Sequence, residues 1–145
     1  MPIVQFSYAN VSSILIKNKK SIKDLIKQIF LKERKVLGRL QYVFCQDDYL
    51  LQINQSHLQH DYYTDIITFD LSDTLDETVG EIYISIDRVK ENSKQHETIF
   101  DQEILRVIFH GALHLCGYRD KTKREITIMR QKEEEYLLLF EKMFK

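Results

Sequence analysis

The sequence lacks the features of an exported or membrane-bound protein. It contains no run of about 18 apolar residues, the length that a membrane-spanning helix needs. Its first residues, MPIVQFSYAN, also lack the basic start and apolar stretch of a signal peptide. Cysteine occurs only twice, as Cys45 and Cys116, so we expect reduced thiols and no disulfide framework. These absences predict a cytoplasmic protein that does not associate with membranes.

An excess of charge of either sign is also absent. The 21 lysine and arginine residues and the 22 aspartate and glutamate residues leave a formal net charge of -1. Any binding of nucleic acid must therefore come from a local basic patch rather than from the charge of the whole protein. No internal repeat and no low-complexity segment is found. The 145 residues suffice for one hydrophobic core, and we expect a single domain over residues 1–145.

Hydrophobic periodicity predicts an α+β fold in which helices pack against a mixed sheet of about four strands. Runs rich in β-branched and aromatic residues predict strands at 2–8, 39–46, 64–71 and 80–86. Apolar residues at helical spacing predict helices at 21–37, 47–57, 87–93, 98–115 and from 122 to the end. The segments 59–63 and 72–78 are expected to be loops.

Helix ends and buried helix positions can be assigned from the same pattern. Ser21 is expected to cap the first helix and Gly38 to end it, and Thr122 with Glu125 forms a capping box for the last helix. The expected buried positions of the helix 98–115 are Ile99, Ile104, Val107, Ile108 and Leu115. Those of the last helix are Ile126, Met129, Tyr136, Leu137, Phe140 and Phe144.

His110 and His114 are the residues that point most directly to chemistry. On a helix, residues four apart are offset by about 40° around the axis and about 6 Å along it, so both imidazoles face one point. A divalent ion such as Zn²⁺ is bound by imidazole nitrogens at about 2 Å, and such a pair supplies two of them. The alternative is that the histidines are packed core residues, because a histidine on an apolar helix face is usually one.

A glycine and an aspartate extend the pair to a possible three-ligand site. Gly117 can end the helix in a left-handed conformation, and the chain then returns Asp120 as a carboxylate ligand. The spacing follows the logic of metzincin zinc sites, in which a glutamate follows the first histidine and acts as general base. Gly111 occupies that position here, so peptide hydrolysis by this route is not expected. Asp120 could instead be a turn residue or anchor the next helix.

The segment 110–120, HGALHLCGYRD, resembles the signature of the YbeY family, bacterial metal-dependent endoribonucleases with the pattern His-Gly-x-Leu-His-Leu-x-Gly-Tyr-Asp-His. It departs from that pattern at Asp120, where the family has its third ligand histidine. The segments 51–54, 64–69 and 80–85 also resemble the family and occur in the family's order. A second departure is Leu58, which stands where the family often carries an arginine.

The resemblance implies a metzincin-like metal site on a helix and the following turn. We expect one Zn²⁺ per chain, or another divalent ion, bound by His110, His114 and Asp120, with catalysis through the metal-bound water. The resemblance further implies single-strand-selective cleavage of RNA in rRNA maturation, at the 3′ end of the small-subunit rRNA, and in ribosome quality control. RNA and the small ribosomal subunit are the implied partners.

Basic residues that follow the metal motif are the preferred RNA contacts. They are Arg119, Lys121, Lys123 and Arg124. Their cationic side chains could hold the phosphate charge of a substrate. The alternative is a solvated basic surface with no partner.

Two other functions stay open from the sequence alone. Two histidines and one carboxylate can hold ferrous iron in an oxygenase. Those ligands, however, normally lie on the strands of a β-barrel, whereas His110 and His114 are expected on a helix. The protein could also be a ribosome-assembly factor that a metal ion stabilises and that catalyses no reaction.

Overall fold

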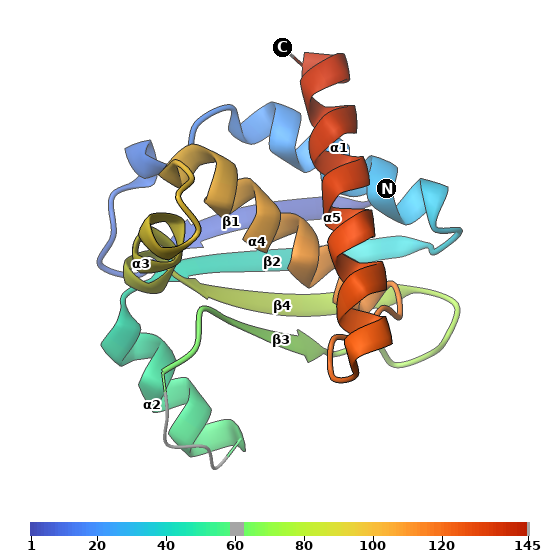
Figure 1. The fold of residues 1–145 in the computed structure, drawn as a ribbon. Helices are drawn as coiled ribbons and strands as arrows, with labels where there is room; N and C mark the ends of the chain where they lie inside the picture. The colour runs from blue at the N-terminus through green and yellow to red at the C-terminus, as the bar shows by residue number, and fades with distance from the viewer. Residues whose placement is uncertain (59–62, 145) are drawn as a thin grey trace.

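A four-stranded mixed sheet forms the centre of the protein (Figure 1), and the computed structural model describes residues 1–58 and 63–144. The strands are β1 (Ile3–Tyr8), β2 (Leu37–Cys45), β3 (Ile66–Asp70) and β4 (Thr78–Ser85), and they lie in the order β1-β2-β4-β3. β1, β2 and β4 are parallel, and β3 pairs antiparallel with β4 at one edge. The predicted α+β class and mixed four-stranded sheet are confirmed. The predicted loop 59–63 lies mostly outside the described residues.

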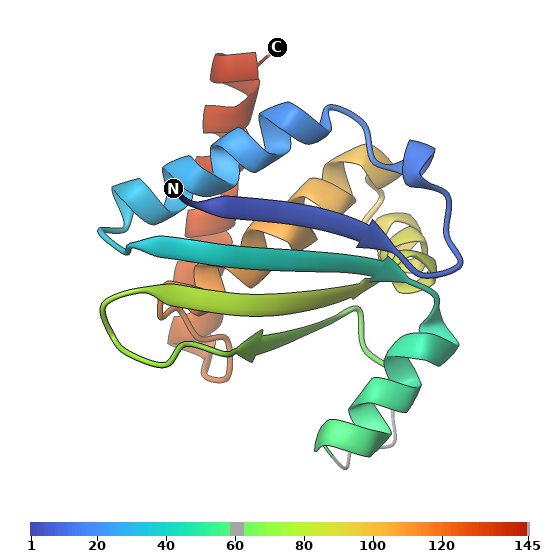
Figure 2. The ribbon, with the colours of Figure 1, turned by 180° about the vertical axis from the view of Figure 1, so that it is seen from behind.

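Helices α1 (Lys19–Lys32), α4 (Phe100–Leu115) and α5 (Lys123–Phe144) lie on one face of the sheet (Figures 1 and 2). α3 (Ile86–Gln95) follows β4 directly, and α2 (Asp47–Leu58) projects beyond the end of β2. A short 3-10 helix, Ser13–Leu15, precedes α1. In the described part of the chain, no helix combines the length and the apolar character needed to cross a bilayer.

The core lies between the sheet and these three helices. Alternate residues of β2, Leu40, Tyr42 and Phe44, are fully buried there, as expected for strands whose side chains point to opposite faces in turn. The Tyr42 hydroxyl donates a hydrogen bond of 2.7 Å to the backbone carbonyl of Ile108. This bond gives a buried polar group its partner and ties β2 to α4.

The first helix differs from its prediction at both ends. It begins at Lys19, after Asn18 in a left-handed conformation (φ 58°), rather than at Ser21. It ends at Lys32, because Arg34 also adopts positive φ (60°) and the Lys35 N–H bonds to the Phe30 carbonyl at 2.8 Å, as in a Schellman motif. The expected stop, Gly38, lies inside β2 instead.

Two residues predicted to be buried are exposed. Ile99 precedes the first turn of α4 and is 69% exposed, and Ile126 is 44% exposed. The remaining predicted core positions of α4 are buried, and Phe144 is partly buried. The capping box is confirmed, because Thr122 and Glu125 exchange hydrogen bonds of 2.9 and 3.1 Å between backbone N–H and side chain. Cys45 and Cys116 are free, buried thiols.

Candidate metal centre

Helix α4 directs two histidines toward one point because its opposite side is fixed in the core. Ile108 and Ala112 are fully buried, which sets the rotation of the helix about its axis. His110 and His114 then lie side by side, with ring centroids 4.7 Å apart and side chains 17% and 29% exposed. The prediction that both imidazoles share one helix face is confirmed.

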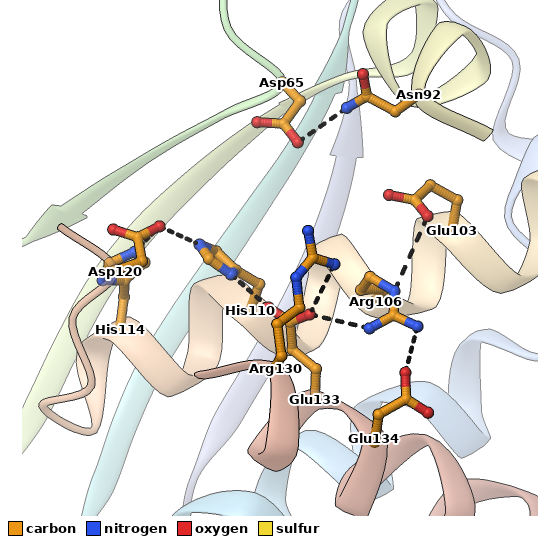
Figure 3. A network of polar contacts seen from close by, with 10 residues as sticks. All are labelled: Asp65, Asn92, Glu103, Arg106, His110, His114, Asp120, Arg130, Glu133 and Glu134. Carbon is orange, nitrogen blue, oxygen red and sulfur yellow. Dashed lines mark hydrogen bonds and ion pairs between the residues drawn. The ribbon is translucent and has the colours of Figure 1, made fainter. Parts of the chain in front are cut away.

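The turn after α4 brings back a third polar side chain. Gly117 has φ 109°, a conformation that costs other residues backbone strain. The N–H groups of Gly117 and Tyr118 bond to the carbonyls of His114 and Leu113 at 3.0 and 3.1 Å, which satisfies the end of the helix. Reversed in this way, the chain places Asp120 over the two histidines (Figure 3).

The distances from Asp120 to the two histidines match those between neighbouring ligands of a divalent ion. Asp120 Oδ2 lies 3.2 Å from His110 Nε2 and 3.5 Å from His114 Nε2, and one ligand atom from each residue falls within 4.8 Å of the others. A tetrahedral ion with bonds of about 2.0–2.1 Å would hold neighbouring ligand atoms about 3.3–3.4 Å apart. Two imidazole nitrogens and one carboxylate oxygen are also a donor set that Zn²⁺ accepts. The residues present therefore fit the ion.

A buried glutamate from α5 completes the surroundings of His110. Glu133 is 3% exposed, and its Oε2 lies 2.7 Å from His110 Nδ1. If the Nδ1 proton is donated to Glu133, the Nε2 lone pair faces the Asp120 oxygen at 3.2 Å. Two lone pairs at that distance repel each other unless a cation, either a proton or a metal ion, lies between them.

The pKa values of the two histidines move in opposite directions. Burial opposes protonation of His110, but the hydrogen bond and charge of Glu133, helped by Asp120, outweigh it and raise the pKa of His110. Burial lowers the pKa of His114, and the charge of His110 lowers it further. His114 therefore loses its proton more readily than His110, and metal binding through nitrogen requires this loss.

Glu133 and the arginine that holds it were not predicted from the sequence. Arg106 Nη1 lies 3.1 Å from Glu133 Oε1, and the same guanidinium also bonds to Glu134 (Figure 3). A signal was present in the sequence, because Glu133 occupies a position of the buried stripe between Met129 and Tyr136. A carboxylate at such a position needs a buried partner.

The three predicted ligands line a cleft of about 680 Å³ between β3, α4 and α5, a size at which proteins bind small ligands. Asp65, just before β3, contributes a half-buried carboxylate that accepts a hydrogen bond of 3.2 Å from Asn92. Burial raises the pKa of Asp65, although the nearby His110 partly opposes the shift. Arg106, Arg130 and Ile126 line the same cleft.

The basic residues that were predicted to bind RNA lie outside this cleft. All four, Arg119, Lys121, Lys123 and Arg124, are exposed on the turn and the first residues of α5. None of them is among the residues that line the cleft. Leu58, which by resemblance stands where the family often carries an arginine, is 40% exposed at the end of α2 and does not line the cleft either.

Comparison with known proteins places most of the chain in one family. The model of the family described as Endoribonuclease YbeY matches residues 7–141. Similar sequences include the Endoribonuclease YbeY of Christiangramia forsetii, 42% identical over 94% of each chain. That of Cytophaga hutchinsonii is 46% identical over 92% of this chain and 94% of the relative.

A solved structure shares the fold. The solution structure of a Thermotoga maritima protein superposes with a TM-score of 0.66 at 27% identity, over 94% of this chain and 88% of that one. The matches run from β1 to α5 and so include His110, His114 and Asp120. The chain belongs to the YbeY endoribonuclease family.

Proposed function

We propose that this chain is a metal-dependent endoribonuclease that cleaves single-stranded RNA, with Zn²⁺ bound by His110, His114 and Asp120. The observation that carries the proposal is the gathering of three ligand atoms within 4.8 Å of one another in a cleft. When bound, the cation supplies a Lewis acid that lowers the pKa of water and withdraws charge from a phosphoryl oxygen. The family of the chain supports RNA as the substrate.

The walls of the cleft suit a strand of RNA. Arg130 lines the cleft with its side chain 54% exposed, and its guanidinium lies 3.7 Å from Glu133, so the exposed guanidinium can also contact a phosphate. Ile126 and Leu115 give the cleft an apolar part that a base can cover. Arg119 and Lys123 are exposed close in sequence to Asp120. We assign them, with Lys121 and Arg124, to RNA phosphates that flank the cleft.

Asp65 is the residue we assign to proton transfer. It lies in the cleft as a half-buried carboxyl group, and burial raises its pKa. An aspartate with a raised pKa retains its proton at a higher pH than an exposed one and can donate it to the oxygen that leaves phosphorus. Asn92 holds one carboxyl oxygen of Asp65 at 3.2 Å, which orients the group.

In the cell, the expected target is the 3′ end of the small-subunit rRNA, cleaved in the cytoplasm on the small ribosomal subunit. This part of the proposal is supported by the resemblance of the segment 110–120 to the family signature and by the family match. The replacement of a ligand histidine by Asp120 leaves the donor set able to bind zinc.

The test is cleavage of single-stranded RNA by the purified chain, compared with a duplex of the same sequence. We expect cleavage of the single strand, its loss with a chelator, and its return with added Zn²⁺. Elemental analysis of protein purified without added metal should find about one divalent ion per chain. The end groups of the products show whether water or a neighbouring 2′-hydroxyl attacks phosphorus.

An Asp120→Ala variant separates catalysis from a purely structural role. It should lose RNA cleavage while still binding the small ribosomal subunit. The control is Asp101→Ala, which removes a carboxylate that is 53% exposed near the start of α4. Equal cleavage by the wild type with and without chelator would overturn the proposal, and so would an Asp120→Ala variant with full activity.

A further inference from the structure

The two carboxylate oxygens of Glu133 have different partners. Oε2 lies 2.7 Å from His110 Nδ1, and Oε1 lies 3.1 Å from Arg106 Nη1. The Arg130 guanidinium is also within 3.7 Å of Oε1. Glu133, on α5, therefore links two residues of α4, the predicted metal ligand His110 and Arg106 (Figure 3).

The position of Glu133 is costly for a carboxylate. It is 3% exposed and lies in the buried stripe of α5, between Met129 and Tyr136. A buried carboxylate loses its hydration, and without charged or hydrogen-bonding partners this loss is not compensated. An apolar residue would pack at this position without that cost, so packing alone does not account for Glu133.

We propose that Glu133 is a positioning residue for the metal ligand His110. It holds the ring proton on Nδ1, which leaves the Nε2 lone pair directed at Asp120 and His114. Arg106 in turn fixes the rotamer of Glu133. This inference rests on the proposed metal site and deepens it, because it explains which nitrogen of His110 binds the ion and what keeps the ring in place.

The geometry around Arg106 supports a role in orientation rather than simple charge pairing. Its guanidinium also contacts Glu134 and approaches Glu103 at 3.9 Å. It is thus held by three carboxylates, of which only Glu133 reaches a histidine of the site. Orienting partners of this kind fix the tautomer of a ligating histidine and raise its basicity.

The test compares Glu133→Gln with two matched variants. Glutamine keeps the size of the side chain but loses its charge and its second acceptor oxygen. Glu103→Gln removes another buried carboxylate near Arg106, and Glu134→Gln removes an exposed one that the same arginine binds. Neither control contacts His110. Zinc affinity is measured by competition with a chromophoric chelator, and thermal melting is measured in excess chelator.

We expect Glu133→Gln to weaken zinc binding by about 10–100-fold, the usual effect of losing such a partner. Both controls should bind zinc as the wild type does. The melting temperature in chelator separates this effect from unfolding, because Glu133→Gln should remain folded there. Zinc binding by Glu133→Gln equal to the wild type, or an equal loss in Glu103→Gln, would overturn the proposal.

A second measurement needs no folded variant. In ¹⁵N spectra of the zinc-loaded wild type, His110 should carry its proton on Nδ1 and bind zinc through Nε2. Zinc on Nδ1 would overturn the role of Glu133. A wild type that binds no zinc would instead overturn the proposed function, so the two failures can be told apart.

Discussion

The Tyr118 hydroxyl donates a hydrogen bond of 2.6 Å to Glu33, 85 residues earlier in the chain. Tyr118 lies on the turn between His114 and Asp120, and Glu33 follows the last residue of α1. Tyr136 on α5 also donates to Glu33, and Lys132 Nζ lies 3.2 Å from it. Glu33 therefore ties the turn that carries Asp120, the third predicted ligand, to both α1 and α5.

We predict that Glu33→Gln destabilises the protein in a pH-dependent way. Partial burial raises the pKa of Glu33, but the hydrogen bonds from Tyr118, Tyr136 and Lys132 outweigh it, so its pKa is lowered from 4.5. A carboxylate with a lowered pKa stabilises the fold above the pKa of the unfolded chain, and this contribution is lost as the pH falls. The difference between wild type and variant should be about 2 kcal/mol at pH 7 and should shrink toward pH 4.

Urea unfolding in chelator at a series of pH values measures this difference. The control is Glu135→Gln, which removes the other carboxylate bound to Lys132, 3.5 Å away and 46% exposed. It should be nearly neutral, as exposed ion pairs usually are. A Glu33→Gln penalty that grows as the pH falls would contradict the prediction.

The parts of the site that the sequence predicted are those set by local geometry. His110 and His114 meet because they are four residues apart on one helix. The chain then reverses at Gly117 and so brings Asp120 back toward them. Glu133 could not be placed in this way, because its contact with His110 joins two helices across 23 residues. Long-range contacts of this kind depend on how the helices pack, which periodicity does not encode.

The same limit explains the errors in the fold. Leu37 was assigned to the first helix by local pattern, but it pairs with Thr78 in the sheet and is 7% exposed. Tertiary pairing overrides local propensity here. Ile126 fits the apolar side of α5 by spacing, yet it is exposed because that side opens into the cleft at this point.

A second prediction concerns Gly111, which occupies the position of the metzincin general base. A Cβ atom there would lie 2.8 Å from Ile82 Cδ1 and 3.0 Å from Ile66 Cδ1, so any side chain would point into the sheet and not into the cleft. Overpacking costs about 1–3 kcal/mol, against a gain of about 1 kcal/mol in helix propensity. Gly111→Ala should therefore be destabilised in urea unfolding, by up to about 2 kcal/mol.

Gly111→Glu should be far less stable, and it should not acquire peptidase activity. Gly117→Ala is the comparison, because a Cβ there meets no atom within 4 Å and its cost comes only from the positive φ. A Gly111→Ala variant more stable than the wild type would show that both isoleucines move aside easily.

Replacing Asp120 by histidine should change which metal the protein prefers. A carboxylate accepts manganese or iron more readily than a third imidazole does, whereas imidazole suits zinc. We predict that Asp120→His shifts the ratio of zinc to manganese affinity toward zinc, as measured by competition with a chelator. Asp120→Asn, which has no charge and no imidazole, should weaken the binding of both ions. An unchanged ratio in Asp120→His would show that Asp120 does not bind the ion.

Asp65→Asn should separate stability from activity. Because burial raises the pKa of Asp65, the folded state retains its proton to a higher pH than the unfolded chain. Stability is therefore lost as the pH rises through this pKa. Asparagine never ionises, so the variant in chelator should be more stable than the wild type at pH 7.

RNA cleavage by Asp65→Asn should fall by about 10²-fold or more if Asp65 transfers a proton. Activity near the wild-type level would exclude that role.

The RNA contacts can be assigned by salt dependence. Each phosphate contact to single-stranded RNA contributes about 0.7 to the slope of log affinity against log salt concentration. We predict that Arg130→Gln, in the cleft wall, lowers the slope by about this amount, as measured by fluorescence anisotropy with an RNA that cannot be cleaved.

Lys123→Gln should lower the slope in the same way if the exposed residues after Asp120 hold the flanking phosphates. Lys20→Gln, exposed on α1, is the control. If Arg130→Gln and Lys20→Gln behave alike, the cleft arginine does not contact phosphate.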